Sequence, residues 1–152
     1  MSQPNSPDDD FVLDEFLPYQ LAVLAGRVSR EFSAIYREKF GFGVSEWRVL
    51  AHLSQTGSVS VREIHEKVDM DKSKVSRAAT RLEKSGYLTK QTNAEDRRLI
   101  ELALTTKGCD VVKQLTPLAQ EFERKVLAQL GDFSEDFRKS VDALLADETT
   151  QR

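Results

Sequence analysis

The stretch from Asp71 to Leu104 changes its hydrophobic period part-way along, and this change constrains the fold more than any other feature of the chain. In its first half the apolar residues recur with the period of a helix. Asp71 suits an N-cap, because its carboxylate can accept hydrogen bonds from backbone N–H groups at the start of a helix. Gly86 suits the end of that helix, because glycine adopts a left-handed conformation at no steric cost. The sequence therefore predicts a helix between these two residues.

This helix has two chemically distinct faces at about 100° of rotation per residue. The apolar face consists of Val75, Ala78, Ala79 and Leu82. The opposite face carries hydroxyl groups and cations: Ser73, Lys74, Arg77, Thr80, Arg81 and Lys84. The pattern predicts that one face packs against the protein and that the other faces a negatively charged partner.

Beyond Gly86 the pattern alternates from residue to residue, as it does in strands. Residues 87–92 can form one strand and residues 100–104 a second, joined by a polar loop at residues 93–98 that is too long for a two-residue turn. A basic helix followed by such a hairpin is typical of a winged helix-turn-helix. The predicted fold is mainly α with a small β-wing. Its helix has the width to enter the major groove of DNA, and the wing tip can place an arginine in the adjacent narrow groove.

The charge distribution favours the same interpretation. Residues 72–98 contain eight basic and three acidic side chains, a local charge of +5, whereas the whole chain carries −3. The remainder is therefore at −8, so the positive charge is concentrated on one contiguous segment. The alternative is an ordinary solvated surface helix, but the capped start, the glycine stop and the arginine-bearing loop favour DNA.

Composition excludes several classes of protein. The 152 residues suffice for one domain, and no run of 18 apolar residues predicts a transmembrane helix. Residues 1–10 lack the apolar segment of a signal peptide, and the single Cys109 cannot form an intramolecular disulfide, so we expect a cytoplasmic protein. Two histidines without assisting ligands do not make a typical zinc site, and no glycine-rich phosphate loop or nucleophile motif is present. We expect no enzyme activity, no metal and no cofactor.

The segments around the central stretch are predicted as follows. Residues 1–10 and 148–152 form polar tails, the first of them disordered. Residues 11–43 contain a long amphipathic helix with an apolar stripe, and residues 44–106 form the winged helix-turn-helix. In that unit we expect Ser45 to cap the second helix and Ser60 with Glu63 to form a capping box for the third. Residues 107–147 form two further helices, capped by Thr105, bent at Pro117 and separated at Gly131.

The terminal helices carry long apolar stripes that the small winged unit cannot cover. These stripes can be buried against each other within one chain or against their copies in a second subunit. We favour a homodimer, because two helices related by a two-fold axis can read half-sites roughly 34 Å apart, whereas one helix contacts too few base pairs.

The same residues resemble the MarR family of bacterial transcription regulators. The resemblance extends over roughly residues 17–145 and is strongest at residues 70–77 and 82–88. The wing signature of the family follows at Asp96-Arg97-Arg98 and Leu104-Thr105. Residues 45–50 are similar to the family's second helix.

The resemblance implies a homodimer that binds a pseudo-palindromic double-stranded operator and usually acts as a repressor. Arg98 would enter the minor groove, held by an ion pair with Asp96. The residues expected to contact DNA are Lys72, Ser73, Lys74, Ser76, Arg77, Arg81, Arg97 and Arg98.

Two residues depart from the family pattern. His65 stands where a small residue is usual; we interpret it as a partly exposed packing residue in preference to a pH sensor. Cys109 lies in the fifth helix, whereas the peroxide sensors of the family carry their cysteine in the first; we interpret it as a packing residue in preference to a redox sensor. The first helix also lacks the tryptophan of the urate-responsive branch.

Many relatives bind small aromatic or anionic compounds, and four residues are candidates for such a site. They are Arg27, Trp47, Arg48 and His52. An aromatic face beside a cation suits a phenolic or aromatic carboxylate effector. The alternatives are a core role for Trp47, an interdomain salt bridge for Arg48 and a surface role for His52. A protein-interaction or redox-responsive module without an effector is the alternative function, although it would not need the +5 face.

Overall fold

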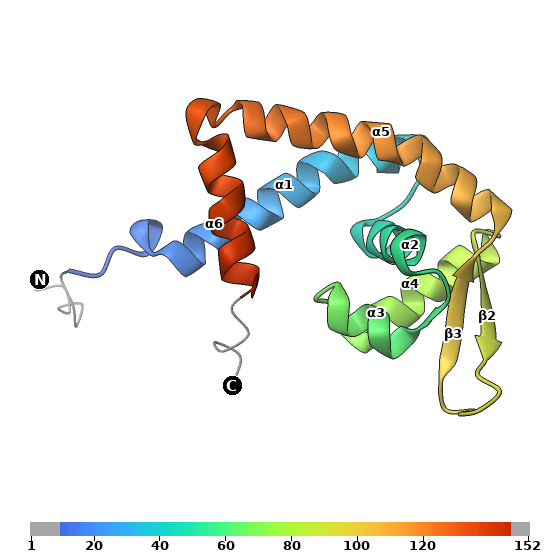
Figure 1. Cartoon of the computed structure of the whole chain (residues 1–152). Coiled ribbons are helices and arrows are strands. Elements are labelled where there is room, and N and C mark those ends of the chain that lie inside the picture. Colours follow the sequence, from blue (N-terminus) through green and yellow to red (C-terminus); the bar gives the residue numbers. More distant parts are fainter. Residues whose placement is uncertain (1–9, 147–152) are drawn as a thin grey trace, which may run out of the picture.

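The computed structural model describes residues 10–146, a mainly helical chain with one small antiparallel sheet (Figure 1). The tails expected at residues 1–10 and 148–152 lie outside the described residues, except for Asp10. The helices are a 3-10 turn at Leu13–Glu15, α1 Leu17–Phe40, α2 Val44–Thr56, α3 Val61–Lys67, α4 Lys72–Lys84, α5 Thr106–Ala128, a 3-10 turn at Gly131–Phe133 and α6 Ser134–Ala146. The strands are β1 Val59–Ser60, β2 Leu88–Thr92 and β3 Ile100–Leu104.

The sheet has the order β1-β3-β2, with every neighbour antiparallel. In the β2–β3 hairpin Leu88 lies opposite Leu104, and Thr92 lies opposite Ile100. The predicted wing is thus confirmed, and β2 begins one residue later than expected. Strand β1 was not predicted, because two residues are too few to show a periodicity; they form a strand only through their pairing with β3.

Helices α2, α3 and α4 and the sheet form the winged unit, residues 44–104, around one apolar core. Fully buried side chains come from each part of it: Leu50, Ile64, Val75, Leu82, Leu88 and Leu102. Val111 and Leu115 of α5 complete this core, so the last long helix is anchored to the winged unit.

The terminal helices α1, α5 and α6 extend away from the winged unit (Figure 1). Helix α1 lies within the predicted residues 11–43, with Pro18 in its first turn and Gly41 ending it at φ +73°. Thr105 caps α5 by accepting a hydrogen bond from the Gly108 amide, as expected. Pro117 lies inside α5.

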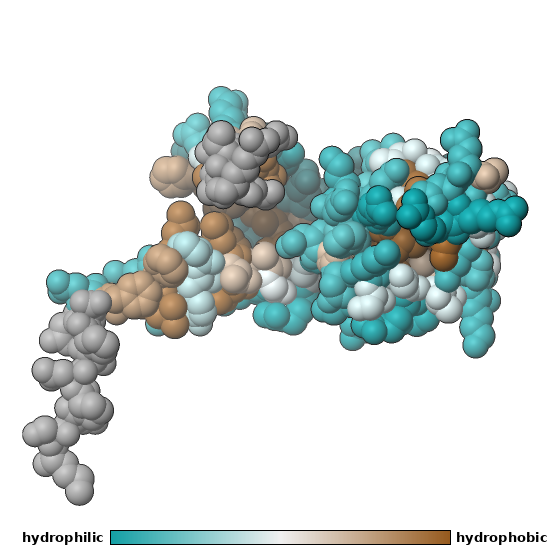
Figure 2. All heavy atoms as spheres, turned by 90° about the horizontal axis from the view of Figure 1, so that it is seen from below, coloured by the Kyte–Doolittle hydropathy of each residue, from teal (hydrophilic) through white to brown (hydrophobic). Residues whose placement is uncertain are grey.

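Large apolar side chains stay exposed along these helices. Figure 2 shows an apolar surface at the end of the molecule away from the winged unit. The exposed residues include Phe11, Phe16, Leu17, Leu21 and Leu24 near the N-terminus and Phe133, Phe137, Leu144 and Leu145 near the C-terminus. A groove of about 400 Å³ runs between α1, α5 and α6, lined by apolar residues such as Phe32, Phe122 and Phe137. Within the protomer Phe32 and Phe122 contact each other, but the ends of the stripes stay exposed.

Some local predictions were wrong. The N-cap of α2 is Gly43, which offers no side-chain cap, and Ser45 lies inside the helix. At Ser60 the hydroxyl accepts from the Glu63 amide, which confirms the cap. Ile100 lies at the wing end of β3 and is exposed, whereas Leu102 of the same strand is buried.

Candidate nucleic-acid interface

Helix α4 begins at the predicted cap. Asp71 Oδ1 accepts hydrogen bonds from the Lys74 amide and the Ser73 hydroxyl, each at 3.1 Å. The Lys74 amide, and after it the Ser73 hydroxyl, hold the pKa of Asp71 below its ordinary value. This carboxylate therefore stays ionised at the positive end of the helix dipole and fixes the first turn of α4.

The inner face of α4 packs against α2 and α3 as predicted. Val75, Ala78, Ala79 and Leu82 are all buried. Because alanine side chains are small, α4 can lie close to its neighbours. The turn before α4 is held by His65, whose Nδ1 lies 3.0 Å from the carbonyl oxygen of Met70. A carbonyl only accepts, so Nδ1 carries the hydrogen, and the packing role expected for this half-buried histidine is confirmed.

The outer face of α4 divides into two halves. In the N-terminal half Lys72, Lys74 and Arg77 are exposed and form no ion pair within residues 10–146. Ser76 is half-buried beside them. In the C-terminal half Thr80 and Arg81 are bound within the protein, whereas Lys84 is exposed. The Thr80 hydroxyl accepts from Lys90 Nζ at 2.7 Å, and Arg81 Nε lies 2.7 Å from Glu46 Oε1.

The tip of the wing is folded by its own side chains. Asn93 Oδ1 accepts from the amides of Glu95 and Asp96 at 2.8 and 3.0 Å. Asp96 Oδ1 in turn accepts from the amide and the Nε of Arg98, at 3.1 and 3.2 Å. These bonds lower the pKa of Asp96, mainly through the Arg98 side chain. The expected ion pair is thus confirmed, and it holds an Arg98 side chain that is 91% exposed.

Arg97 and Arg62 add positive charge near this tip. Arg97 is exposed next to Arg98 in the loop. Arg62 projects from the first turn of α3 and lies near enough to contribute to the lowered pKa of Asp96. The sequence analysis missed Arg62 because it treated residues 60–63 only as a helix cap. Its nearness to the wing follows from the β1–β3 pairing, which places the start of α3 beside β3.

The segment of residues 105–108 connects the end of α4, the wing and the start of α5. The Thr105 hydroxyl donates to the Gly86 carbonyl at 2.6 Å, and Lys107 Nζ donates to the Ser85 carbonyl at 2.8 Å. Lys107 also lies over the Tyr87 ring, 4.5 Å from its centroid. A Cβ on Gly108 would lie 2.0 Å from the Tyr87 carbonyl oxygen, so only glycine fits there. The end of α4 is therefore fixed to the start of α5.

The four candidate ligand residues do not lie in one hollow. Trp47, Arg48 and His52 line an open hollow of about 370 Å³ with Ala51 and Val68. Arg27 lies on α1 in a separate hollow beside Tyr19 and Leu24. Arg48 forms no ion pair within residues 10–146, and its Nη2 lies 3.5 Å from the Ser29 hydroxyl, so the alternative of an interdomain salt bridge is not seen there.

Trp47 also belongs to an aromatic cluster. Its ring centroid lies 5.3 Å from that of Phe32 and 5.8 Å from that of Tyr36, both on α1. Burial, the largest effect, raises the pKa of the Tyr36 hydroxyl above its ordinary value. Trp47 is therefore a packing residue with one edge in the hollow.

Three further features of the described residues concern metal binding, the single cysteine and membrane helices. Among residues 10–146 no group of three histidine, cysteine or carboxylate side chains could hold a metal ion. Cys109 is exposed, so its predicted packing role is wrong: it lines an open hollow beside Leu104 and Val112, whereas Val111 and Leu115 are buried in the core. No helix in the described part of the chain has both the length and the apolar character needed to cross a membrane.

Comparison with known proteins places these features in a family. The model of the MarR family matches residues 44–100, which contain the three helices and most of the wing. The repressor MdtR of Bacillus subtilis is 39% identical over 71 residues, a match that covers 47% of this chain and 46% of MdtR. The regulator PapX of Escherichia coli is 30% identical over 122 residues, covering 79% of this chain and 74% of PapX. The chain belongs to the MarR family.

A solved structure agrees with this assignment. The MarR/EmrR family regulator from Acinetobacter sp. ADP1 superposes with a TM-score of 0.80 at 27% identity, covering 93% of this chain and all of that chain. The predicted winged helix-turn-helix fold is therefore confirmed. The MarR-family protein is a DNA-binding transcription regulator and not an enzyme, in agreement with the function expected from its residues.

Proposed function

We propose that this regulator is a homodimeric repressor of a pseudo-palindromic operator. The observation that carries the proposal is the division of α4: its N-terminal half presents Lys72, Lys74 and Arg77 without ion pairs in the described residues. The N-terminal residues of a recognition helix are the ones that reach base edges in the major groove. Ser73 and Ser76 lie between these cations and add hydroxyl groups to the same surface.

The wing supplies a second contact in this proposal. Arg98 enters the minor groove, where the potential is most negative, and Arg97 and Arg62 contact the phosphates beside it. Asp96 fixes the backbone and the Nε of Arg98, so that the other guanidinium nitrogens point away from the protein. Both contacts lie on one rigid unit, because the end of α4 and the start of α5 are bound together.

Dimerisation is supported by the exposed apolar stripes of residues 11–43 and 107–146. Monomeric proteins rarely expose contiguous apolar patches of this kind. A two-fold axis through these helices would bury the stripes and present two α4 helices to successive half-sites. Residues 44–106 would then be the DNA-binding domain of each subunit, working in the cytoplasm.

We propose that an aromatic carboxylate is the effector that releases this regulator from DNA. The hollow at Trp47, Arg48 and His52 combines an aromatic edge with a cation that has no carboxylate partner in the described residues. Thermal shift with a panel of aromatic acids tests this: salicylate-like acids should stabilise the wild type but not the Arg48→Met variant. Arg27→Met, in the other hollow, is the control. Equal stabilisation of all three proteins, or of none, would count against the hollow.

Binding to DNA from beside the protein's own gene tests the main proposal. Fluorescence anisotropy should give one dimer per duplex, with an affinity that falls steeply as salt rises. A protein-interaction or redox-responsive module would show neither. Repression is tested separately by a reporter driven by the same DNA, which the intact gene should silence.

A further inference from the structure

Arg81 and Glu46 form a short ion pair between two helices of the winged unit. Arg81 Nε lies 2.7 Å from Glu46 Oε1, and the side chains are 54% and 13% exposed. Glu46 is in the first turn of α2 and Arg81 in the last turn of α4. Each charge therefore sits at the helix end whose dipole favours it, and the pair joins the two helix ends.

The rest of the α2–α4 contact is apolar and non-directional. Ala78 and Ala79 are buried on the inner face of α4, and their short side chains allow close packing but carry no polar group that could fix an angle by hydrogen bonding. The ion pair is directional, because the geometry of a guanidinium bound to a carboxylate is restricted. Among residues 10–146 it is the only side-chain hydrogen bond that joins α2 to α4.

Glu46 is also next to the residue that holds α2 against the terminal helices. Trp47 packs on Phe32 of α1, and Phe32 lies 5.2 Å from Phe122 of α5, measured between ring centroids. A continuous set of contacts thus runs from α5 and α1 through α2 to α4. Figure 1 shows α2 in this intermediate position.

We propose that Glu46 and Arg81 are positioning residues, which set the angle of α4 to the terminal helices, and that Arg81 acts through Glu46 and not by contact with DNA. This replaces the sequence-based expectation that Arg81 meets the major groove. The inference rests on the proposed role of α4 in binding DNA.

Four full-length variants test it: Arg81→Ala, Glu46→Ala, the double alanine variant and the charge-swapped pair Glu46→Arg with Arg81→Glu. Operator affinity is measured by fluorescence anisotropy over a range of salt. We expect each single alanine variant to bind roughly 10-fold more weakly, the double variant no worse than either, and the swapped pair to recover most of the affinity. Because the Arg81 side chain is exposed to solvent, the thermal midpoint should change only slightly, and more in Arg81→Ala, where the largely buried Glu46 keeps its charge without a partner.

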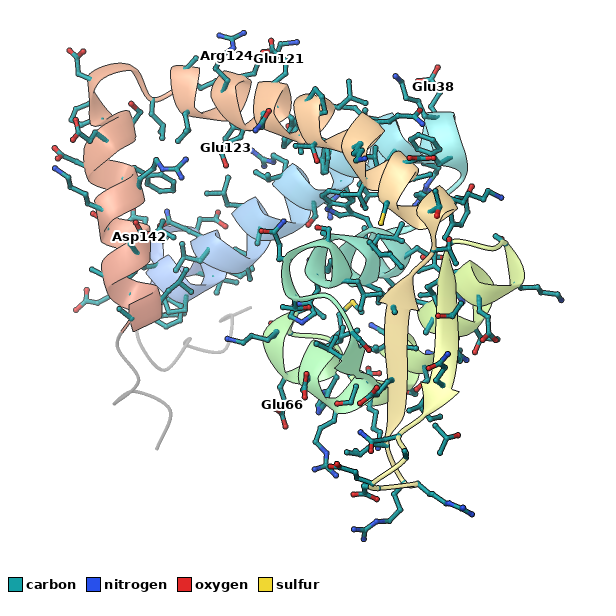
Figure 3. All side chains as sticks on the ribbon, turned by 45° about the vertical axis from the view of Figure 1, so that its right-hand side comes forward. Glu38, Glu66, Glu121, Glu123, Arg124 and Asp142 are labelled. Atoms are coloured by element: carbon teal, nitrogen blue, oxygen red, sulfur yellow. The ribbon has the colours of Figure 1, made fainter. Side chains whose placement is uncertain are left out.

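Salt dependence separates positioning from contact. Removal of a phosphate contact lowers the log-log slope by about 0.9, so Arg81→Ala should leave the slope unchanged while Lys74→Ala reduces it. Glu121→Ala, which breaks an exposed pair with Arg124 within α5, is the control for the loss of an ion pair away from α4 and should not alter affinity. Figure 3 shows Glu121 and Arg124 on the outer side of α5.

Two results would overturn the inference: a flattened slope in Arg81→Ala with no recovery in the swapped pair, or tighter binding by Glu46→Ala. If instead the wild type fails to bind, or Lys74→Ala and Arg77→Ala bind as well as the wild type, the proposed role of α4 fails and not the ion pair alone.

Discussion

Apolar residues are buried in the winged unit but exposed along the terminal helices. In the winged unit Leu50, Leu82 and Leu102 are at most 1% exposed, and the charges lie outside. Along the terminal helices Leu17, Leu21 and Leu145 are 57%, 42% and 78% exposed. The core of the winged unit is thus buried within one chain, with Val111 and Leu115 of α5 completing it, whereas the exposed stripes of the terminal helices need a second surface.

Substitutions in this protein should therefore fall into three kinds. Changes in the winged core should act on the folding of each chain, at any protein concentration. Changes on the exposed stripes should act on assembly, and their effect should depend on protein concentration. Changes on the outer face of α4 or on the wing should affect neither, but only DNA binding.

The largest effect is expected for Leu21→Asp. A buried leucine contributes about 1.5–3 kcal/mol, and a two-fold interface contains the residue twice, so the dimer should lose roughly 3–6 kcal/mol. Light scattering should show a monomer whose circular dichroism is unchanged. The control is Ala34→Asp, which places the same carboxylate at an exposed position of α1 outside the stripe. A Leu21→Asp variant that stays dimeric at low concentration would show that this stripe is not the interface.

Leu82→Ala should come next. Leu82 is 1% exposed in the winged core, and truncation of such a leucine costs about 2–5 kcal/mol of unfolding free energy. Urea denaturation should detect this destabilisation at every protein concentration. Ile100→Ala, at an exposed apolar position of the wing, should cost less than about 0.5 kcal/mol. Similar destabilisation in both variants would remove the distinction between core and surface in this unit.

Arg77→Ala should weaken operator binding by about 1–3 kcal/mol if the side chain contacts a guanine edge. Specificity should relax at one base pair of each half-site, because the other contacts remain. Competition with single-base operator variants measures this. Uniform weakening on every sequence would instead assign Arg77 to a phosphate.

Arg98→Ala should weaken operator binding less than Arg77→Ala. The major-groove contact of α4 remains in this variant, and only the additional contact of the wing is lost. The dimer should stay intact by light scattering. The matched control is Arg30→Ala on α1, an exposed arginine away from the winged unit. Undiminished operator binding by Arg98→Ala would refute the wing assignment.

The smallest effect is expected from Asp71→Asn at low pH. Hydrogen bonds lower the pKa of Asp71 below its ordinary value of 3.8, so the folded state disfavours the proton. The stability from this ionisation is fully present above that value and is lost as the pH falls through the lower, folded pKa. Asparagine still accepts the cap hydrogen bond but does not titrate. The stability difference between wild type and variant should therefore shrink in acid; a constant difference would exclude the ionised cap.

The sequence predicted those parts of the fold that depend on neighbouring residues. The cap at Asp71, the buried face of α4 and the bounds of β3 all follow from patterns within a few residues, whereas the Asp96–Arg98 pair was expected from the family resemblance. Strand β1, the Glu46–Arg81 pair and the position of Arg62 depend on contacts between distant segments, which periodicity does not report. The separation of Arg27 from Trp47 was missed for the same reason. Gly43 replaced Ser45 as the cap because α2 begins directly after the turn at Gly41.

The most direct test of binding by paired α4 helices is the stoichiometry and salt dependence on a duplex that contains the operator, measured together by anisotropy and light scattering. We predict two chains per duplex and an affinity that falls linearly with salt on a log-log plot. Lys74→Ala should reduce the slope of that plot by about 0.9 for each phosphate that the lysine neutralises in the wild type. A single chain per duplex, or a slope that Lys74→Ala leaves unchanged, would contradict the claim that paired α4 helices bind DNA.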